Sequence, residues 1–237
     1  MRINRIALNG FRNYDFETAD FSPGTNVIYG ENAQGKTNLL EAVYYLAGAR
    51  SFRTRFDREL IGFDRDAARL RAAVWSGERE QQLDILLRRG QKKLLQRNGA
   101  RASAAEMSET VRAVLFSPDD LGLIRDGAAA RRRLMDLAIC QLRPGYGKLI
   151  ADYGRVYENK MRLLRDYRED RAMMDCFDEF SDSLARLSAK IIRYRVSFAR
   201  ALSDAAAPIH REFSGAGETL GIEYRTVSTV QDALSKI

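Results

Sequence analysis

Histidine, cysteine and long apolar runs are scarce in this chain of 237 residues. Because His210 is the only histidine, we expect neither a histidine metal site nor a catalytic triad. Cys140 and Cys176 are isolated and form no C-x-x-C pair, so we expect buried thiols in a reducing cytoplasm. No apolar run approaches membrane-spanning length, and early charges in residues 1–5 argue against a signal peptide. These absences set aside secreted, membrane-spanning and histidine-dependent classes.

The composition is that of a soluble globular protein, with 45% hydrophobic and 30% charged residues. The length is enough for one large domain, or one and a half, with a substantial core. The formal net charge is +7, and residues 50–101 alone carry 14 Lys/Arg against 7 Asp/Glu. A basic surface of this kind indicates a polyanion partner, nucleic acid first, although a solvated basic face without a partner has the same composition.

The most specific motif lies in residues 26–47. Residues 30–37 read Gly-Glu-Asn-Ala-Gln-Gly-Lys-Thr and match the phosphate-binding loop G-x-x-x-x-G-K-S/T at every fixed position. The apolar residues 27–29 before the loop are typical of a strand buried on both faces. Apolar residues after the loop recur at helical spacing until Gly48, where we expect the helix to stop. Strand, loop and helix therefore follow in the order that a nucleotide site requires.

The chemistry of such a loop assigns a role to each part of it. Gly30 and Gly35 allow the backbone to approach a ligand closely, and the backbone N–H groups form an anion site with the helix N-terminus. Lys36 is expected at the β- and γ-phosphates of ATP, and the Thr37 hydroxyl on Mg²⁺. The predicted cofactor-binding residues are Gly30, Glu31, Asn32, Ala33, Gln34, Gly35, Lys36 and Thr37.

Alternating apolar residues predict strands on both sides of the loop. Ile6 and Leu8 alternate in one strand and Tyr14 and Phe16 in the next, with a turn signal at Asn9–Gly10. We expect this hairpin to join a parallel strand at residues 27–29 in a mixed sheet. Three later runs separated by glycine turns predict an antiparallel sheet added beside it: residues 70–74, 83–87 and 92–97.

A further apolar run at residues 111–116 ends in Ser117-Pro118-Asp119-Asp120 and has two interpretations. Asp119 or Asp120 would be the second metal-binding carboxylate of a phosphate-loop enzyme. Alternatively, Ser117 is a helix N-cap, Pro118 takes the first helical position, and Asp120 is the third-position acid of a capping box. We favour the cap.

From Ala128 to Phe213 the pattern is helical almost throughout. Two successive heptad stripes predict an antiparallel helical hairpin that turns at residues 171–175 and reaches about 50 Å. Alternation over residues 219–227 then predicts a return to strand. We therefore expect an α/β phosphate-loop fold with an added antiparallel sheet and an inserted helical-hairpin arm. Its predicted parts are an ATP-binding lobe (1–127), the helical arm domain (128–214) and a truncated return to the ATPase domain (215–237).

Motifs spread over most of the chain carry a family resemblance. They are IALNGFRNY (6–14), GENAQGKTNLLEA (30–42), SFRT (51–54), RELI (58–61), FSPDDL (116–121) and RRRLMD (131–136). In combination they resemble the N-terminal two-thirds of RecF, the bacterial recombination mediator ATPase. RecF is an ABC-type ATPase related to the chromosome-maintenance and Rad50 proteins.

The resemblance implies a cytoplasmic, nucleoid-associated protein of DNA replication, DNA-damage repair and the SOS response. Such a protein uses ATP and Mg²⁺ to form a homodimer, binds duplex DNA beside single-strand gaps, and helps RecO and RecR to load the recombinase. It does not bind membranes. Arg12 and Asn13 end a strand that passes close to the nucleotide in relatives, although a turn cap and a surface arginine would have the same sequence.

The resemblance is incomplete in the part of the family that performs hydrolysis. The signature motif and the metal-binding Asp-Asp strand (Walker B) are not present in these residues, which indicates a truncated chain. Full-length members are expected to be weak DNA-dependent ATPases, and this chain is predicted to be hydrolysis-incompetent. We name no catalytic residue.

The DNA-binding candidates come from the basic stretch: Arg53, Arg88, Arg89, Lys92 and Lys93. Two other functions stay open. One is a small phosphate-loop kinase that uses Asp119 or Asp120 on the metal, for which the long arm is a poor lid. The other is an interaction module with nucleotide as a structural ligand only. Nucleotide-dependent DNA binding, set against phosphorylation of small acceptors, distinguishes these functions.

The first prediction concerns the lysine of the loop. Lys36→Ala should abolish ATP binding and leave the fold intact, because the ammonium is expected to contact ligand rather than core. Isothermal titration calorimetry measures the affinity, and thermal unfolding of the same samples checks the fold. Equal ATP affinity in this variant and the parent chain would remove the phosphate-loop assignment.

Overall fold

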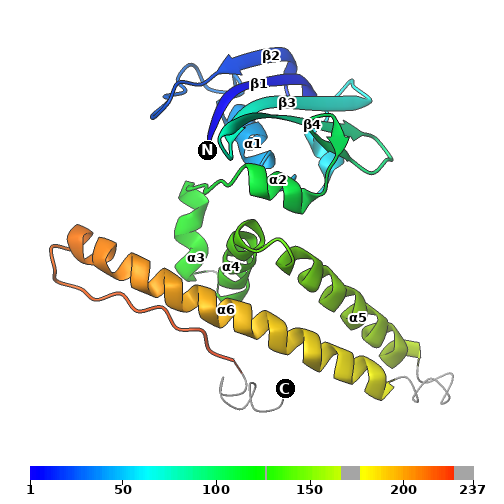
Figure 1. The fold of residues 1–237 in the computed structure, drawn as a ribbon, viewed down its shortest axis with the longest axis vertical. Coiled ribbons are helices and arrows are strands. Elements are labelled where there is room, and N and C mark those ends of the chain that lie inside the picture. Colours follow the sequence, from blue (N-terminus) through cyan, green and yellow to red (C-terminus); the bar gives the residue numbers. More distant parts are fainter. Residues whose placement is uncertain (126, 167–176, 227–237) are drawn as a thin grey trace. The chain divides into compact units, whose positions relative to one another are not determined.

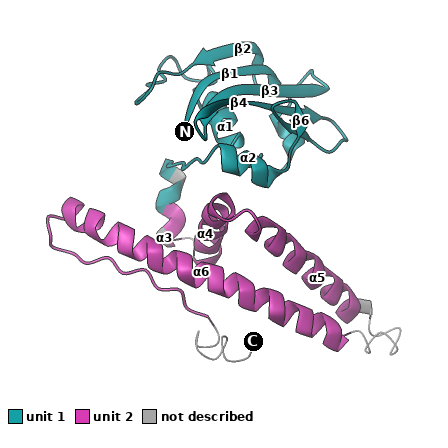
Figure 2. Ribbon diagram, viewed as in Figure 1, with its two compact units in different colours: residues 1–121 teal, residues 122–237 magenta. Residues whose placement is uncertain are grey.

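The computed structural model describes residues 1–125, 127–166 and 177–226. Strands gather in the N-terminal half of the chain and long helices in the C-terminal half (Figure 1). The chain divides into two compact units, Met1–Leu121 (unit 1) and Gly122–Ile237 (unit 2), which Figure 2 distinguishes by colour. The three-part division at residues 127 and 214 stays a prediction.

Unit 1 is built on one antiparallel sheet with the strand order β2-β1-β3-β4-β5-β6. The strands are β1 (Arg2–Phe11), β2 (Tyr14–Asp20), β3 (Ala67–Ser76), β4 (Arg79–Arg88), β5 (Leu94–Arg97) and β6 (Ala100–Arg101). The predicted hairpin and the predicted meander are therefore confirmed as strands, but they belong to one sheet because β1 pairs directly with β3. The expected mixed sheet with a separate added sheet is wrong.

One face of this sheet forms the core of unit 1. Leu70 lies opposite Ile85 in the β3–β4 register, and both side chains are fully buried. Ala42 and Tyr45 of helix α1 (Lys36–Tyr45) belong to the same apolar cluster. Because successive side chains of a strand alternate between faces, the buried apolar residues of β1, β3 and β4 lie on one face of the sheet and form one cluster with residues of α1. The alternation in the sequence predicted this face.

Three predicted strands are not formed within the residues that the structure describes. Residues 27–29 have no strand partner, and the side chains of Val27 and Tyr29 are 77% and 89% exposed. Residues 111–116 and 219–226 also lie outside any strand. Apolar content predicted these strands, but a strand also needs a neighbour to pair its backbone N–H and C=O groups. In the described ranges, none of the three segments is paired in this way.

Short helices complete unit 1: η1 (Asp57–Leu60), α2 (Ala104–Thr110) and η2 (Pro118–Leu121). Helix α2 begins with a capping box in which Ser103 and Glu106 bond each other's backbone N–H groups. The Glu106 carboxylate accepts from the Ser103 backbone N–H and from the Ser103 hydroxyl, and these two bonds hold the pKa of the Glu106 carboxyl below its usual range because they favour its charged form. The cap fixes where the chain turns from the last strand into α2.

Unit 2 is helical, as the heptad stripes predicted. Its helices are α3 (Gly122–Arg125), α4 (Ala128–Leu142), α5 (Tyr146–Asp166) and α6 (Phe177–Phe213). Helices α5 and α6 pack on each other around Tyr146 and Ile191, and the 37 residues of α6 give it a length of about 55 Å. The turn predicted at residues 171–175 lies outside the described residues. Cys140 of α4 is half-buried rather than buried as expected, and Cys176 lies outside the described residues.

A polar cluster joins three helices of unit 2. Asp136 of α4 accepts two hydrogen bonds from the Arg195 guanidinium of α6, at 2.9 and 2.7 Å. The hydroxyl of Tyr146, the first residue of α5, donates to the same carboxylate at 2.6 Å. Burial, with Asp136 as the acceptor, raises the pKa of Tyr146 above its usual value and keeps the phenol neutral.

Candidate functional site

The phosphate-loop motif forms an exposed loop that leads directly into helix α1. Lys36 is the first residue of α1 and Gly35 is its N-cap, with φ +106°. Gly30 has φ +142°, so both motif glycines adopt backbone angles that other residues rarely adopt. No side chain caps the helix. The unpaired N–H groups and the positive end of the helix dipole therefore suit an anion at this point.

The Lys36 side chain turns back over the loop. Its ammonium donates to the carbonyl oxygens of Gly30 at 2.7 Å and Glu31 at 2.5 Å. The ammonium thus lies within the curve of the loop, beside the uncapped helix end, and Thr37 is exposed on the first turn of α1. These residues fit a nucleotide phosphate, with the Thr37 hydroxyl as a ligand for Mg²⁺. The individual roles of the loop residues stay predictions.

The turn between β1 and β2 lies against the phosphate loop. The Asn13 amide donates to the Gln34 carbonyl at 3.4 Å, and the Tyr14 hydroxyl donates to the Gly35 carbonyl at 3.1 Å. A Cβ atom at Gly35 would lie 2.9 Å from the Asn13 amide and from the Tyr14 ring, and φ is +106°, so a residue with a side chain would be strained there and would displace both neighbours. Asn13 is therefore next to the loop, and a contact of Arg12 or Asn13 with the nucleotide stays a prediction.

The position of this turn corrects a sequence prediction. We expected it at Asn9–Gly10, but β1 continues to Phe11 and the chain turns at Arg12–Asn13. Arg12 has φ +54°, which is unusual for a residue with a side chain. The types of the turn residues alone could not locate the turn, because the Arg12 side chain bonds residues that are distant in the sequence, Glu41 and Glu59.

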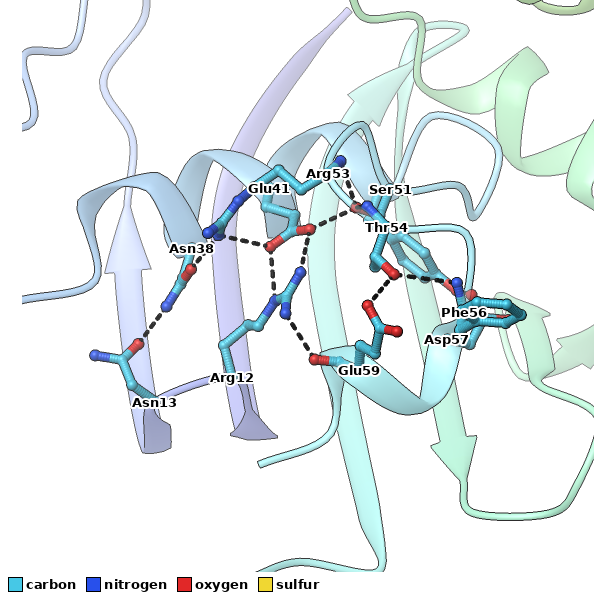
Figure 3. Close-up of polar contacts among 11 residues, drawn as sticks. Arg12, Asn13, Asn38, Glu41, Ser51, Arg53, Thr54, Phe56, Asp57 and Glu59 are labelled. Atoms are coloured by element: carbon cyan, nitrogen blue, oxygen red, sulfur yellow. Dashed lines mark hydrogen bonds and ion pairs between the residues drawn. The ribbon is translucent and has the colours of Figure 1, made fainter. Parts of the chain in front are cut away.

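Glu41, on the buried face of α1, is the centre of these contacts (Figure 3). Its carboxylate accepts hydrogen bonds from Arg12 Nε at 2.9 Å and Arg12 Nη2 at 2.8 Å. It also accepts from the Ser51 hydroxyl and from Arg53 Nη1, the latter at 3.3 Å. The third donor of Arg12 bonds the Glu59 carbonyl at 2.7 Å. All three guanidinium nitrogens of Arg12 thus donate to protein atoms.

Asn38 connects this cluster to the phosphate loop. Its amide nitrogen donates to Asn13 Oδ1 at 2.7 Å, and its amide oxygen accepts from Arg53 Nη1 at 2.7 Å. Since Asn13 in turn donates to the Gln34 carbonyl, a continuous hydrogen-bonded path leads from the loop backbone to Arg53 and Glu41. Figure 3 shows the part of this path from Asn13 to Glu41. Sequence reasoning assigned no role to Glu41 or Asn38. One signal was available: Glu41 is the only acidic residue of α1, and the motifs at residues 6–14 and 51–54 each contain an arginine, Arg12 and Arg53, but no acidic residue.

Three of the five DNA-binding candidates make contacts within unit 1. Arg53 belongs to the Glu41 cluster. The Arg89 guanidinium donates to three backbone carbonyls in residues 62–65. Lys93 donates to the Ala49 carbonyl at 2.6 Å and pairs with Asp57 at 3.0 Å. These contacts give each side chain a structural role, and DNA binding by them stays a prediction.

The other two candidates, Arg88 and Lys92, are exposed and have no side-chain hydrogen bond or ion pair among the described residues. Arg88 lines an open pocket of about 260 Å³ with Arg55 and Arg58. Phe56 stands at the same pocket, 55% exposed, with the Arg58 guanidinium 5.0 Å from the centre of its ring. This basic pocket with an aromatic wall lies at the end of β4.

Asp120 behaves as the cap interpretation predicts. Its carboxylate accepts hydrogen bonds from the backbone N–H of Ser117 at 2.7 Å and from the Ser117 hydroxyl at 3.1 Å. The helix that follows, η2, is a single 3₁₀ turn rather than a long helix. The side chain of Asp119 lies outside what the structure describes, so its role in metal binding stays a prediction.

The described residues contain neither a clustered metal site nor a membrane-spanning helix. In those ranges, no three His, Cys, Asp or Glu side chains come together in a group that could hold a metal ion. Nor is any described helix both long enough and apolar enough to cross a membrane.

Comparison with known proteins identifies the class to which this fold and loop belong. Residues 2–221 match the model of the RecF/RecN/SMC N-terminal domain, and the chain belongs to that family. The predicted resemblance to RecF is confirmed by the relatives. The chain is 35% identical to the DNA replication and repair protein RecF of Acetivibrio thermocellus. The 225 aligned residues cover 94% of this chain and 61% of the relative. RecF of Geobacillus sp. strain WCH70 is 33% identical, over 99% of this chain and 63% of the relative.

Solved structures agree with the sequence relatives. A structure of the recombination mediator RecF with ATP matches 99% of this chain and 65% of its own, with 28% identity and a TM-score of 0.86. A second RecF structure, described as RecF-ATPrS, has 30% identity and the same TM-score of 0.86, over 90% of this chain and 58% of its own. The predicted fold class is confirmed. The chain spans about three fifths of the length of the curated relatives it matches.

Proposed function

We propose that this chain is the nucleotide-binding part of a RecF-type recombination and repair mediator, and that it binds Mg-ATP through residues 30–37. The observation that carries the proposal is the loop itself. Two glycines with positive φ lead into an uncapped helix, and the Lys36 ammonium lies within the curve of the loop. This arrangement presents N–H groups and a cation to phosphate oxygens. The RecF structure with ATP supports ATP as the ligand.

The whole family protein supplies the remaining parts of the proposed function. By analogy with RecF, we propose an ATP-dependent homodimer that binds DNA beside single-strand gaps and acts with RecO and RecR to load the recombinase, in the bacterial cytoplasm at the nucleoid. Binding to the loop needs only backbone N–H groups, Lys36 and Thr37. Hydrolysis also needs a positioned water and charge stabilisation across the dimer. The sequence carries neither the signature motif nor the metal-binding Asp-Asp strand for this.

The test of the proposal separates binding from turnover. The 237-residue chain should bind Mg-ATP weakly, hydrolyse it negligibly and stay unchanged in mass when ATP is added. Calorimetry, steady-state ATPase assays and light scattering with and without ATP measure these three properties. Lys36→Ala reports the background of each assay. Robust turnover that is lost in Asp119→Asn would contradict the proposal and favour a compact phosphate-loop kinase.

We further propose that DNA binds at the basic pocket at the end of β4. Arg55, Arg58 and Arg88 converge on it, and the one carboxylate at the pocket, Asp57, is already paired with Lys93. Arginines on a shallow pocket suit the phosphate backbone, which requires positive charge but no base readout. Arg89, by contrast, is held by backbone carbonyls, so it is a weaker candidate than its neighbour.

The strand β4 offers a matched pair of arginines to test this placement. Arg88 ends the strand at the pocket, and Arg79 begins it about 30 Å away. Both are exposed and lack a side-chain ion pair among the described residues. Arg88→Glu should weaken binding of gapped DNA and reduce the slope of log affinity against log salt by about 0.9 per lost phosphate contact.

Fluorescence anisotropy across a salt series measures both quantities. Arg79→Glu changes the net charge by the same amount. It should leave the affinity and the salt slope close to those of the parent chain, with only the small loss that the change in overall charge causes. If the two variants behave alike, the pocket is not the DNA site, and the helical arm becomes the better candidate.

A further inference from the structure

We infer that Glu41 is a positioning residue for the phosphate loop: without touching the nucleotide, its buried carboxylate holds the loop in its binding conformation through Arg12, Asn13 and Asn38. This role rests on the proposed ATP binding, because Glu41 acts on the conformation of the same site. No loop residue contacts Glu41 directly in the bonds described above. The effect must therefore travel through the β1–β2 turn and the Asn38 amide.

The burial of the carboxylate makes this cluster sensitive to its charge. The Glu41 side chain is 0% exposed, whereas those of Arg12 and Arg53 are 19% and 42% exposed. A buried carboxylate is tolerated only when it is paired and hydrogen-bonded. Here Arg12, Arg53 and Ser51 supply all the donors. A neutral amide at position 41 would point an N–H₂ group at one of these donors and leave two guanidinium groups without their counter-charge.

Arg12 transmits the effect to the turn. Its φ of +54° is an unfavourable backbone angle for arginine, and its guanidinium is fixed by two bonds to Glu41 and one to the Glu59 carbonyl. The next two residues, Asn13 and Tyr14, donate to the loop carbonyls. If the Arg12 side chain loses these bonds, nothing stabilises its positive φ, and the turn that positions the Asn13 and Tyr14 donors changes conformation.

The phosphate loop lies directly against the turn. A Cβ atom at Gly35 would lie 2.9 Å from the side-chain ends of Asn13 and Tyr14, so both side chains pack on the loop backbone. The carbonyls of Gln34 and Gly35 accept the two hydrogen bonds of the turn. Each of those carbonyls shares a planar peptide unit with a loop amide: the Gln34 carbonyl with the Gly35 N–H, and the Gly35 carbonyl with the Lys36 N–H. A moved turn would therefore also rotate the amides that bind phosphate.

The test is the ATP affinity of Glu41→Gln in the full chain, measured by calorimetry beside the parent. We expect a loss of about tenfold, the size of one charge-assisted hydrogen bond. Tyr45→Phe is the matched control. Tyr45 is buried one turn further along α1, and its hydroxyl bonds Asp57 at 2.7 Å, away from the loop. It should bind ATP within twofold of the parent even though it also loses a buried hydrogen bond.

A double-mutant cycle shows whether the effect passes through the turn. Asn13→Ala should weaken ATP binding, and adding Glu41→Gln to it should weaken binding by less than the product of the two single effects. If Glu41→Gln does not fold, Asn38→Ala replaces it, because Asn38 is only half-buried and lies on the same path. Asn38→Ala should then cost several-fold in affinity, and no loss would overturn the inference.

The remaining outcomes separate this inference from the proposed function. Parent-like affinity in Glu41→Gln, or multiplicative effects in the cycle, would overturn the positioning role while leaving ATP binding by the loop in place. If the parent chain itself binds no more ATP than Lys36→Ala, the proposed function fails, and the inference fails with it.

Discussion

The Glu41 carboxylate is the interaction on which the geometry of the site depends, because it joins three segments of unit 1 that are distant in sequence. It lies on α1 and bonds Arg12 at the end of β1 and Ser51 and Arg53 in the loop after α1. Two arginines on one buried acid leave a net positive charge beside the phosphate loop. The same cluster that stabilises the junction of helix and sheet therefore also raises the positive potential where an anion is expected.

The register of the antiparallel sheet fixes where Arg12 lies relative to Glu41. Ile6 and Leu8 of β1 must face the core, so the alternation of side chains fixes which face each later residue of the strand takes. A slip by one residue would turn these side chains to solvent and carry Arg12 away from Glu41. Core packing of the sheet thus sets the register, and the register delivers Arg12 and Asn13 to the loop. The loop conformation therefore depends on contacts of Arg12 and Glu41 that lie outside the loop itself.

Elements with a strong local signal were predictable from the sequence. The phosphate loop and α1 follow from a spaced motif and a 3.6-residue period, and β3 and β4 from alternation such as Leu70, Ala72 and Val74. The predicted strands that are not formed among the described residues would need a neighbouring strand, and the local sequence does not show whether such a neighbour is present. Residues 27–29 are apolar like a strand but lack a neighbouring strand among the described residues, so Tyr29 is exposed.

The candidate site shows the same division. The loop residues could be predicted because the G-x-x-x-x-G-K-S/T spacing is a recognisable pattern of phosphate-binding loops. Glu41 and Asn38 were missed because their roles arise from tertiary contacts with Arg12, Asn13 and Arg53, which are 12 or more residues away along the chain. Arg53 and Arg89 were predicted to bind DNA from charge alone. Their guanidinium groups also bond protein atoms, which composition cannot reveal, and DNA binding by them stays a prediction.

The coupling between the loop and the β1–β2 turn is tested most directly by hydrogen–deuterium exchange of the chain with and without Mg-ATP. Backbone amides exchange more slowly when a ligand stabilises the segment that contains them. Added Mg-ATP should slow exchange in residues 30–38 and, together with them, in residues 12–14, while the β4–β5 turn at residues 89–93 stays unchanged. Protection confined to the loop, with residues 12–14 exchanging as before, would contradict the account.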